Sequence, residues 1–199
     1  MPSLAELLKT LEETPTNESL NIENCYLVDR EPAELRTFVE RLASSPFQSL
    51  NLRLNFLGYC QAEKVEALFS GLASTQIQSL DLSQNFLGAW ELPQINSFIA
   101  SLRGTQIHTL SLETNNLDNW DEARIRTFFE GLTGTSIQSL HLKDFNLDAL
   151  NESCFAAFST AISSNPNFIT IEGLTGSRAK DINDMLHDPI FPHLDFNFL

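Results

Sequence analysis

Basic residues are scarce in this chain, which has 12 lysines and arginines against 26 aspartates and glutamates, and a formal net charge of −14. A nucleic-acid partner needs clustered lysine and arginine side chains that neutralise phosphates, so the composition argues against one. The same shortage disfavours binding to an anionic membrane surface. A basic partner is compatible with the charge, although acidity is also a common route to solubility.

Long apolar runs and paired cysteines are also missing. No run approaches the roughly 18 residues that a membrane-spanning helix needs, and residues 1–6 lack the basic and apolar regions of a signal peptide. The three cysteines, Cys25, Cys60 and Cys154, form no C-x-x-C pair, so we expect small, reduced side chains. These absences predict a protein of a reducing compartment.

A repeat with a period of thirty residues is the most informative feature that is present. Leucine or isoleucine recurs in five copies at three positions of the period: Leu20, Leu50, Leu80, Leu110 and Leu140; Ile22, Leu52, Leu82, Leu112 and Leu142; and Leu27, Leu57, Leu87, Leu117 and Leu147. The copy from Ile77 to Leu87 reads I-x-S-L-x-L-x-x-N-x-L. Such a period is typical of stacked units, each of which buries its apolar face only against its neighbours.

Each copy combines a strand pattern with a helix pattern. Apolar residues alternate over residues 80–82, as in a short strand. The second half of each copy has helical spacing, which in the first copy places apolar residues at Leu35, Phe38, Val39 and Leu42. We predict parallel strands, each followed by a helix, near residues 19–23, 49–53, 79–83, 109–113 and 139–143, with a weaker sixth near 169–172. Strands lie about 4.8 Å apart and helices about 8–10 Å, so the stack should curve with its strands on the inside.

The pattern L-x-x-L-x-L-x-x-N-x-L resembles the leucine-rich repeat, and the long unit with a helix is similar to the ribonuclease-inhibitor-like class. The resemblance covers roughly residues 17–175. At the asparagine position the five copies hold Cys25, Asn55, Asn85, Asn115 and Phe145. The resemblance implies an α/β leucine-rich-repeat solenoid, with a curved parallel sheet on the concave side and helices on the convex side, that binds a protein partner. The acidic composition, rich in phenylalanine and asparagine, also resembles bacterial leucine-rich-repeat effectors, while a resident cytosolic role is equally compatible.

Both ends of the stack need caps over their apolar faces. Residues 1–16 contain a capping box, Ser3 with Glu6, at the start of a helix predicted to cover the first repeat. Residues 176–199 are predicted to form the C-terminal cap, with a helix near 177–186 and an apolar tail. The tail is expected to fold over the last repeat or, alternatively, to act as a short recognition segment. About six repeats over residues 17–175, with no linker, predict a single domain spanning residues 1–199.

Outward-facing residues should form rows across the predicted sheet. One row consists of hydroxyl residues, predicted to be structural: Ser19, Ser49, Ser79, Thr109 and Ser139. A second row nearly alternates in charge: Glu23, Arg53, Ser83, Glu113, Lys143 and Glu172. We expect Glu23 to pair with Arg53 and Glu113 with Lys143, each exposed pair contributing about 0–1 kcal/mol.

The middle row contains residue types found in hydrolases. It reads Asn21, Asn51, Asp81, Ser111, His141 and Thr170. The serine lies between the aspartate and the histidine, so no carboxylate lies beyond the histidine to orient it. No glycine-rich elbow supplies an oxyanion hole, no histidine pair has metal-ligand spacing, and no glycine loop fits a phosphate. We therefore expect a protein that is not an enzyme and that uses no cofactor or metal.

Aromatic residues lie at the edge where each strand turns into its loop. Tyr26, Phe56 and Phe86 occupy this position in the first three copies, and Asn116 and Asn146 occupy it in the last two. Partly exposed aromatic stripes are common interface anchors, although rings packed along the loops would have the same spacing. Both interpretations remain open from the sequence.

Two tryptophans, Trp90 and Trp120, lie one period apart where loop meets helix. We predict that they hold the helix starts in place; the alternative is a second contact surface.

The sequence thus predicts a monomeric, non-catalytic module that binds a protein partner of unknown identity, and neither nucleic acid nor membrane. The concave face and the adjoining loop edge supply the predicted contact residues: Tyr26, Arg53, Leu54, Phe56, Asp81, Phe86, Glu113 and His141. The alternative is a structural scaffold, or a module that self-associates through its apolar tail or its aromatic stripe. The predicted location is the cytoplasm, or the cytosol of a host cell if the protein is an effector.

Overall fold

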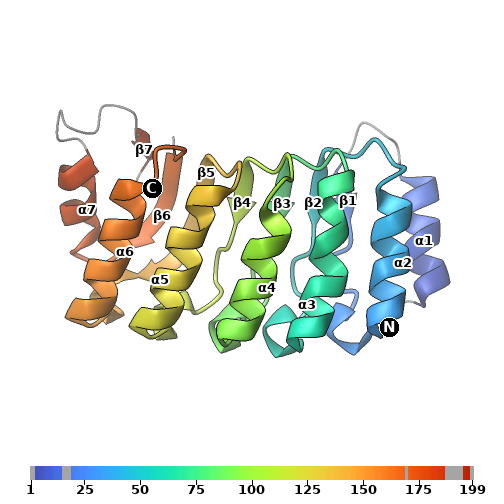
Figure 1. Ribbon diagram of the computed structural model, residues 1–199, viewed down its shortest axis with the longest axis horizontal. Helices are drawn as coiled ribbons and strands as arrows, with labels where there is room; N and C mark the ends of the chain where they lie inside the picture. Colours follow the sequence, from blue (N-terminus) through green and yellow to red (C-terminus); the bar gives the residue numbers. More distant parts are fainter. Residues whose placement is uncertain (1–2, 15–18, 169, 187–194, 198–199) are drawn as a thin grey trace.

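The computed structural model describes residues 3–14, 19–168, 170–186 and 195–197, which form one parallel sheet with a layer of helices against it (Figure 1). The strands follow chain order: β1 (Leu20–Asn21), β2 (Ser49–Asn51), β3 (Ser79–Asp81), β4 (Thr109–Ser111), β5 (Ser139–Asn146), β6 (Thr170–Thr175) and β7 (Asp195–Asn197). The helices are α1 (Leu4–Glu13), α2 (Pro32–Leu42), α3 (Ala62–Phe69), α4 (Leu92–Leu102), α5 (Glu122–Gly131), α6 (Glu152–Ser164) and α7 (Ala179–Leu186). The α/β solenoid predicted from the repeat is confirmed.

The thirty-residue period appears directly as strand register. Leu20 pairs with Leu50, and the next copies continue this row as far as Leu140, which pairs with Ile171 in β6. The first four strands are shorter than predicted, with two or three residues each. In these repeats the chain leaves the ladder early and forms a 3-10 turn before the helix: η1 (Leu27–Asp29), η2 (Leu57–Tyr59), η4 (Leu87–Ala89) and η5 (Leu117–Asn119).

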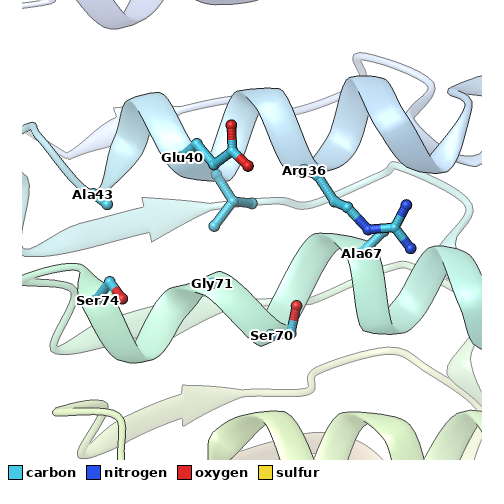
Figure 2. A pocket seen from close by; sticks show the side chains of 8 residues that line it. Arg36, Glu40, Ala43, Ala67, Ser70, Gly71 and Ser74 are labelled. Atoms are coloured by element: carbon cyan, nitrogen blue, oxygen red, sulfur yellow. The ribbon is translucent and has the colours of Figure 1, made fainter.

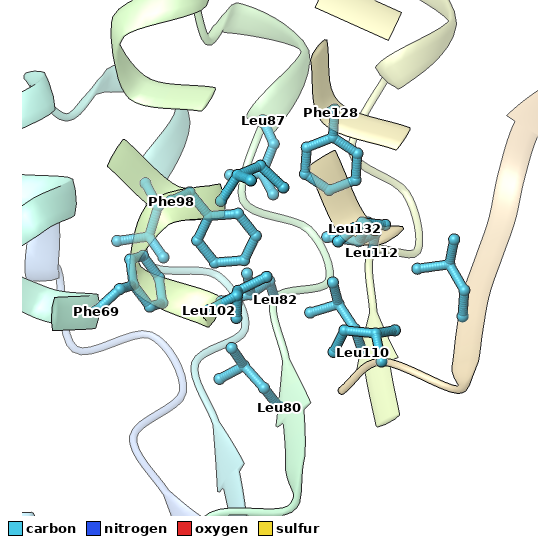
Figure 3. Close-up of a cluster of buried hydrophobic side chains, with 14 of the residues drawn as sticks. Phe69, Leu80, Leu82, Leu87, Phe98, Leu102, Leu110, Leu112, Phe128 and Leu132 are labelled. Atoms are coloured by element: carbon cyan, nitrogen blue, oxygen red, sulfur yellow. The ribbon is translucent and has the colours of Figure 1, made fainter. Parts of the chain in front are cut away.

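A continuous apolar core lies between the strands and the helices. Leu80 and Leu82 point into it and are fully buried. Figure 3 shows how leucines of the strands meet phenylalanines of the helices in the middle repeats. The ring of Phe98 packs edge-on against Phe69 at 4.9 Å and stacks on Phe128 at 6.1 Å. Full burial of one such side chain is worth roughly 1.5–3 kcal/mol, so each helix is stabilised by its neighbours more than by its own propensity.

The two tryptophans belong to this core. Trp90 and Trp120 are buried, and their rings pack against Phe98 and Phe128. Trp90 also donates its indole N–H to the carbonyl oxygen of Leu57 at 2.8 Å, which ties the start of one helix to the preceding repeat. Their predicted structural role is therefore confirmed, and they offer no second contact surface.

Three buried asparagines connect successive repeats. The Oδ1 atom of Asn85 accepts hydrogen bonds from the backbone N–H groups of Asn55 (2.8 Å) and Leu57 (3.3 Å). Its Nδ2 atom donates to the carbonyl oxygens of Leu52 (2.8 Å) and Leu82 (2.9 Å). The remaining members, Asn55 and Asn115, make the corresponding bonds to their own preceding repeats. Each asparagine thus supplies partners to backbone groups that the turn removes from the ladder.

The fifth repeat departs from this pattern where Phe145 replaces asparagine. The ring is buried and packs against Phe158 at 5.2 Å, and β5 continues as far as Asn146. In β6 a glycine is required opposite, because Gly173 has a φ of +79° and a Cβ atom there would lie 2.7 Å from the backbone nitrogen of Lys143. The pairing of β5 with β6 shifts between His141 and Phe145 as a result.

Helices lie at both ends of the described stack. The Ser3–Glu6 capping box begins α1, whose Leu7 and Leu11 are buried. The predicted second cap helix is α7, and β7 adds a parallel strand beside β6. The rest of the apolar tail lies outside the described residues.

We expect Asn85→Ala to destabilise the fold strongly, because it leaves buried N–H and C=O groups of two repeats without partners. Each such group costs about 1–3 kcal/mol, and the sum should appear as a lower urea midpoint in circular dichroism. The matched control is Asn96→Ala on the exposed side of α4, where a change within about 0.5 kcal/mol is expected. Equal midpoints for the two variants would contradict a stabilising role for the buried asparagines.

Candidate functional site

Four aromatic side chains line the edge where the sheet turns toward the helices, and we call them the aromatic edge: Tyr26, Phe56, Tyr59 and Phe86. The ring of Tyr26 stacks on Phe56 at 5.6 Å, and Phe56 stacks on Phe86 at 5.8 Å. Tyr59 leans on Phe86 at 5.9 Å. Tyr26, Tyr59 and Phe86 are 37%, 63% and 39% exposed, so the stack is open to solvent along its length.

The backbone beneath these rings is left-handed. Tyr26, Phe56 and Phe86 have φ angles of 55°, 59° and 60°. Asparagine tolerates this conformation far better than a bulky residue does, and Asn116 occupies the equivalent position with a φ of 56°. Backbone preference therefore opposes the aromatic residues, and ring stacking of about 0.5–1.5 kcal/mol per pair offsets the strain.

The turn beside Phe56 approaches the next repeat closely. A Cβ atom at Gly58 would lie 1.9 Å from the carbonyl oxygen of Phe86, so only glycine fits there. Stacking itself does not require the glycine, because the first repeat has Val28 at this position and its Tyr26 stacks on Phe56 at 5.6 Å.

The middle row of the strand face differs from the prediction at its last position. His141 is opposite Glu172 in the β5–β6 register, and Thr170 is opposite Ser139. The prediction that placed Thr170 in the His141 row, and Glu172 in the Lys143 row, was wrong by two residues. The step from β5 to β6 is 31 residues, since Leu140 pairs with Ile171, whereas the prediction assumed that the sixth repeat was one residue short before its strand. Two residues are lost only after Glu172, where Phe145 pairs with Leu174.

The predicted ion pairs Glu23–Arg53 and Glu113–Lys143 do not form either; no ion pair joins these four residues, all of which are described. Glu113 lies after the end of β4, whereas Lys143 lies within the longer β5. The two side chains therefore project from backbone segments of different conformation. The Nε atom of Arg53 is buried without a hydrogen-bond partner among the described residues.

The corrected register creates an arrangement that resembles a catalytic triad. The Oγ atom of Ser139 lies 3.2 Å from Nε2 of His141, and Oε2 of Glu172 lies 3.5 Å from Nδ1 of the same ring. The sequence missed this trio because it placed Glu172 in another row.

Within the described part of the chain, the backbone donors beside this trio supply no oxyanion hole. The N–H group of Ser139 donates to the carbonyl oxygen of His108 at 2.8 Å, and that of Leu112 donates to His141 at 2.9 Å. These donors lie in the plane of the sheet and cannot converge above Ser139 on a developing negative charge. The geometry therefore supports hydrogen bonding on the strand face better than acyl transfer.

A shallow pocket of about 320 Å³ lies on the other side of the molecule, between α2 and α3 (Figure 2). The pocket forms because several of the facing residues are small. It is lined by Arg36, Val39, Glu40, Ala43, Ala67, Ser70, Gly71 and Ser74. Arg36 pairs with Glu63 at 3.8 Å outside the pocket. This lining contains no histidine, cysteine or paired carboxylates, so the pocket offers little for acid–base chemistry.

The thiols and possible metal ligands give no further site. Burial raises the pKa of Cys60 to about 11 and raises the pKa of Cys25 as well, so both remain protonated near neutral pH. Among the described residues, no three histidine, cysteine or acidic side chains are grouped to hold a metal ion. In the same part of the chain, no helix is long and apolar enough to cross a membrane.

The structure brings together part of the predicted contact set. Tyr26, Phe56 and Phe86 meet in the aromatic edge, while Asp81 and His141 lie apart in the middle row of the strand face. The carboxylate of Asp81 makes a local hydrogen bond, in which its Oδ1 atom accepts the backbone N–H of Ser83 at 2.8 Å. The sequence missed Tyr59 because the other copies hold unrelated residues at its position: Asp29, Ala89, Asn119 and Ala149.

Comparison with solved structures identifies the type of solenoid. The chain is similar to the crystal structure of the leucine-rich repeat-containing protein LegL7 from Legionella pneumophila, with a TM-score of 0.75 and 24% sequence identity. The match covers 98% of this chain and 61% of that one, so this chain spans less than two thirds of the length of LegL7. The likeness shows that the chain has a leucine-rich-repeat fold. No protein-family profile and no curated protein sequence matches it.

We expect no hydrolase activity from the strand face, because the serine–histidine–carboxylate trio has no oxyanion donors. Wild type, Ser111→Ala, Ser139→Ala and His141→Ala should give the same background rate with p-nitrophenyl esters and phosphates, and no labelling by a fluorophosphonate probe. Turnover or labelling in the wild type that Ser139→Ala or His141→Ala abolishes would establish an enzyme instead.

Proposed function

We propose that this protein is a non-catalytic interaction module that binds a protein partner through the strand face and the aromatic edge. The observation that carries the proposal is the aromatic edge itself, where partly exposed rings occupy left-handed positions that suit asparagine better. Clustered, partly exposed aromatic residues are frequent anchors of protein interfaces.

The size of the strand face supports a role for the edge. The strands β1 to β6 lie about 4.8 Å apart and span about 24 Å, and the five residues from Ser79 to Ser83 and their equivalents add at most about 16 Å, for an area of about 400 Å². A standard interface buries about 800 Å² on each partner. A partner of ordinary affinity must therefore also cover a flank, and the flank with exposed rings is the aromatic edge.

The composition and the fold support a further part of the proposal, that the protein is an effector delivered into the cytosol of a host cell. A translocation reporter fused to the chain tests this part. A reporter signal confined to the bacterium would leave a resident interaction module as the function.

The alternative is self-association, which the exposed rings also favour. Light scattering over a range of protein concentrations separates the two, because a monomer keeps a constant mass. We expect a monomer; a mass that doubles with concentration, and that the Phe56→Asn variant keeps monomeric, would favour self-association.

We expect Phe56→Asn and Phe86→Asn each to weaken partner binding by more than about 1 kcal/mol, or roughly fivefold, without unfolding the protein. Asparagine relieves left-handed strain while removing the stacking contribution, so the free energy of unfolding should change by less than about 1 kcal/mol. The partner is first identified by proximity labelling, and affinities are then measured by calorimetry beside urea denaturation.

Lys143→Ala is the control, because this exposed side chain makes no ion pair among the described residues. It should bind like the wild type. If both asparagine variants bind normally, or lose binding only in proportion to lost folded protein, the rings are structural and the partner sits elsewhere.

A further inference from the structure

After Phe86, the residue type at the ring position changes from aromatic to asparagine. The next two repeats place Asn116 and Asn146 at the ring position, and the turns beside them carry the carboxylates Asp118 and Asp144. The ring positions along this border are therefore aromatic in the first three repeats, and carboxylates lie beside the equivalent positions of the fourth and fifth. Two exposed residues depart from this division, Asp29 in the first turn and Lys143 next to Asp144.

No ion pair within the described residues neutralises these two carboxylates. Among the described residues neither Asp118 nor Asp144 forms an ion pair, and Asp144 is exposed and accepts only the hydroxyl of Thr114, at 2.9 Å. Asp148 in the following turn differs, because it accepts the backbone N–H groups of Ser177 and Arg178, which lowers the pKa of its carboxyl. Asp148 thus holds the C-terminal cap. Asp144 is exposed and Asp118 is half-buried, and neither has an ion-pair partner among the described residues.

We propose that the partner presents an extended segment with an apolar or aromatic anchor next to lysine or arginine residues. The anchor lies on the aromatic edge, and the basic residues lie over Asp118 and Asp144. This inference rests on the proposed interaction function and adds the chemistry and the direction of the partner along the stack.

The repeat spacing sets the distance between the two parts of the segment. The rings advance by 5.6 and 5.8 Å per repeat, so two further steps place the Asp144 turn about 11 Å beyond Phe86. An extended segment rises about 3.3 Å per residue. The basic residues therefore follow or precede the anchor by about two to four positions.

Charge complementarity selects this occupant over others. An acidic segment would meet both the two carboxylates and a chain of net charge −14. A second copy of this chain, aligned along the same border, would place one acidic turn against another. A basic segment alone would leave the rings uncovered.

Synthetic peptides of about twelve residues test the inference by fluorescence polarisation, at protein concentrations up to about 1 mM. One peptide carries a Trp-Leu anchor with four lysines three positions away, made in both chain orders. A second replaces the lysines by serine, a third replaces them by glutamate, and a fourth keeps the lysines and replaces the anchor by serine.

We expect the anchored basic peptide to bind about threefold to tenfold more tightly than the anchored serine peptide at low salt, with the difference shrinking as salt rises. The glutamate peptide should bind most weakly of the three anchored peptides. Asp118→Asn with Asp144→Asn should remove the preference for lysine. Asparagine keeps the shape of both side chains and tolerates the left-handed backbone of residue 144, whose φ is 69°.

The control Glu40→Gln with Glu66→Gln makes the same change in net charge on the exposed sides of α2 and α3, and it should keep the preference. Equal binding of lysine, serine and glutamate peptides, or a preference that the control pair also removes, overturns the basic-segment inference and leaves the aromatic anchor in place. No binding of any anchored peptide, or lysine-peptide binding that Phe56→Asn with Phe86→Asn does not weaken, overturns the inference together with the role of the aromatic edge.

Discussion

The buried side chains of Asn55, Asn85 and Asn115 are the contact on which the geometry of the repeats depends. Each carries both donors and acceptors into a region where the backbone has left the strand ladder. One amide group fixes the distance to the preceding repeat and holds the turn of that repeat, because its Oδ1 atom accepts two backbone N–H groups there. Short strands, left-handed turns and stacked rings all follow from the path of that turn.

The end of this asparagine series marks a change in the molecule. At Phe145 an apolar ring replaces the amide, and β5 continues in extended conformation as far as Asn146. The pairing of β5 with β6 shifts between His141 and Phe145, so the strand ends of the two repeats follow a register different from that of their beginnings. The His141–Glu172 pair lies before this shift, in the register that starts at Ser139 and Thr170.

The sequence predicted what depends on periodicity. The strand rows, the helices after them, the Ser3 cap and the burial of Trp90 all repeat or follow a local rule, so their positions could be read from residue spacing. Features outside the period were missed. Tyr59 has no counterpart in other copies, and the register of β6 shifts at Gly173. The side chains of Glu113 and Lys143 do not pair, because Glu113 lies in a turn and Lys143 lies in a strand.

The candidate interface was predictable only in part. The spacing of Tyr26, Phe56 and Phe86 showed that the rings share an edge, but not that they are stacked and exposed. The left-handed backbone beneath them is set by the turn around the buried asparagine, and a bulky residue gives no sign of it. The structure therefore adds that these rings are held against the preference of the backbone.

The left-handed positions also separate what must be kept from what can vary. Their side chains project from the border of the stack, while the leucines and the asparagine amides that hold each repeat point inward. A residue on this border can change without repacking the core, and asparagine is always tolerated there because it adopts the left-handed conformation readily. Such a chain can acquire or lose specificity one repeat at a time, so duplication of repeats would supply new recognition surfaces faster than new folds.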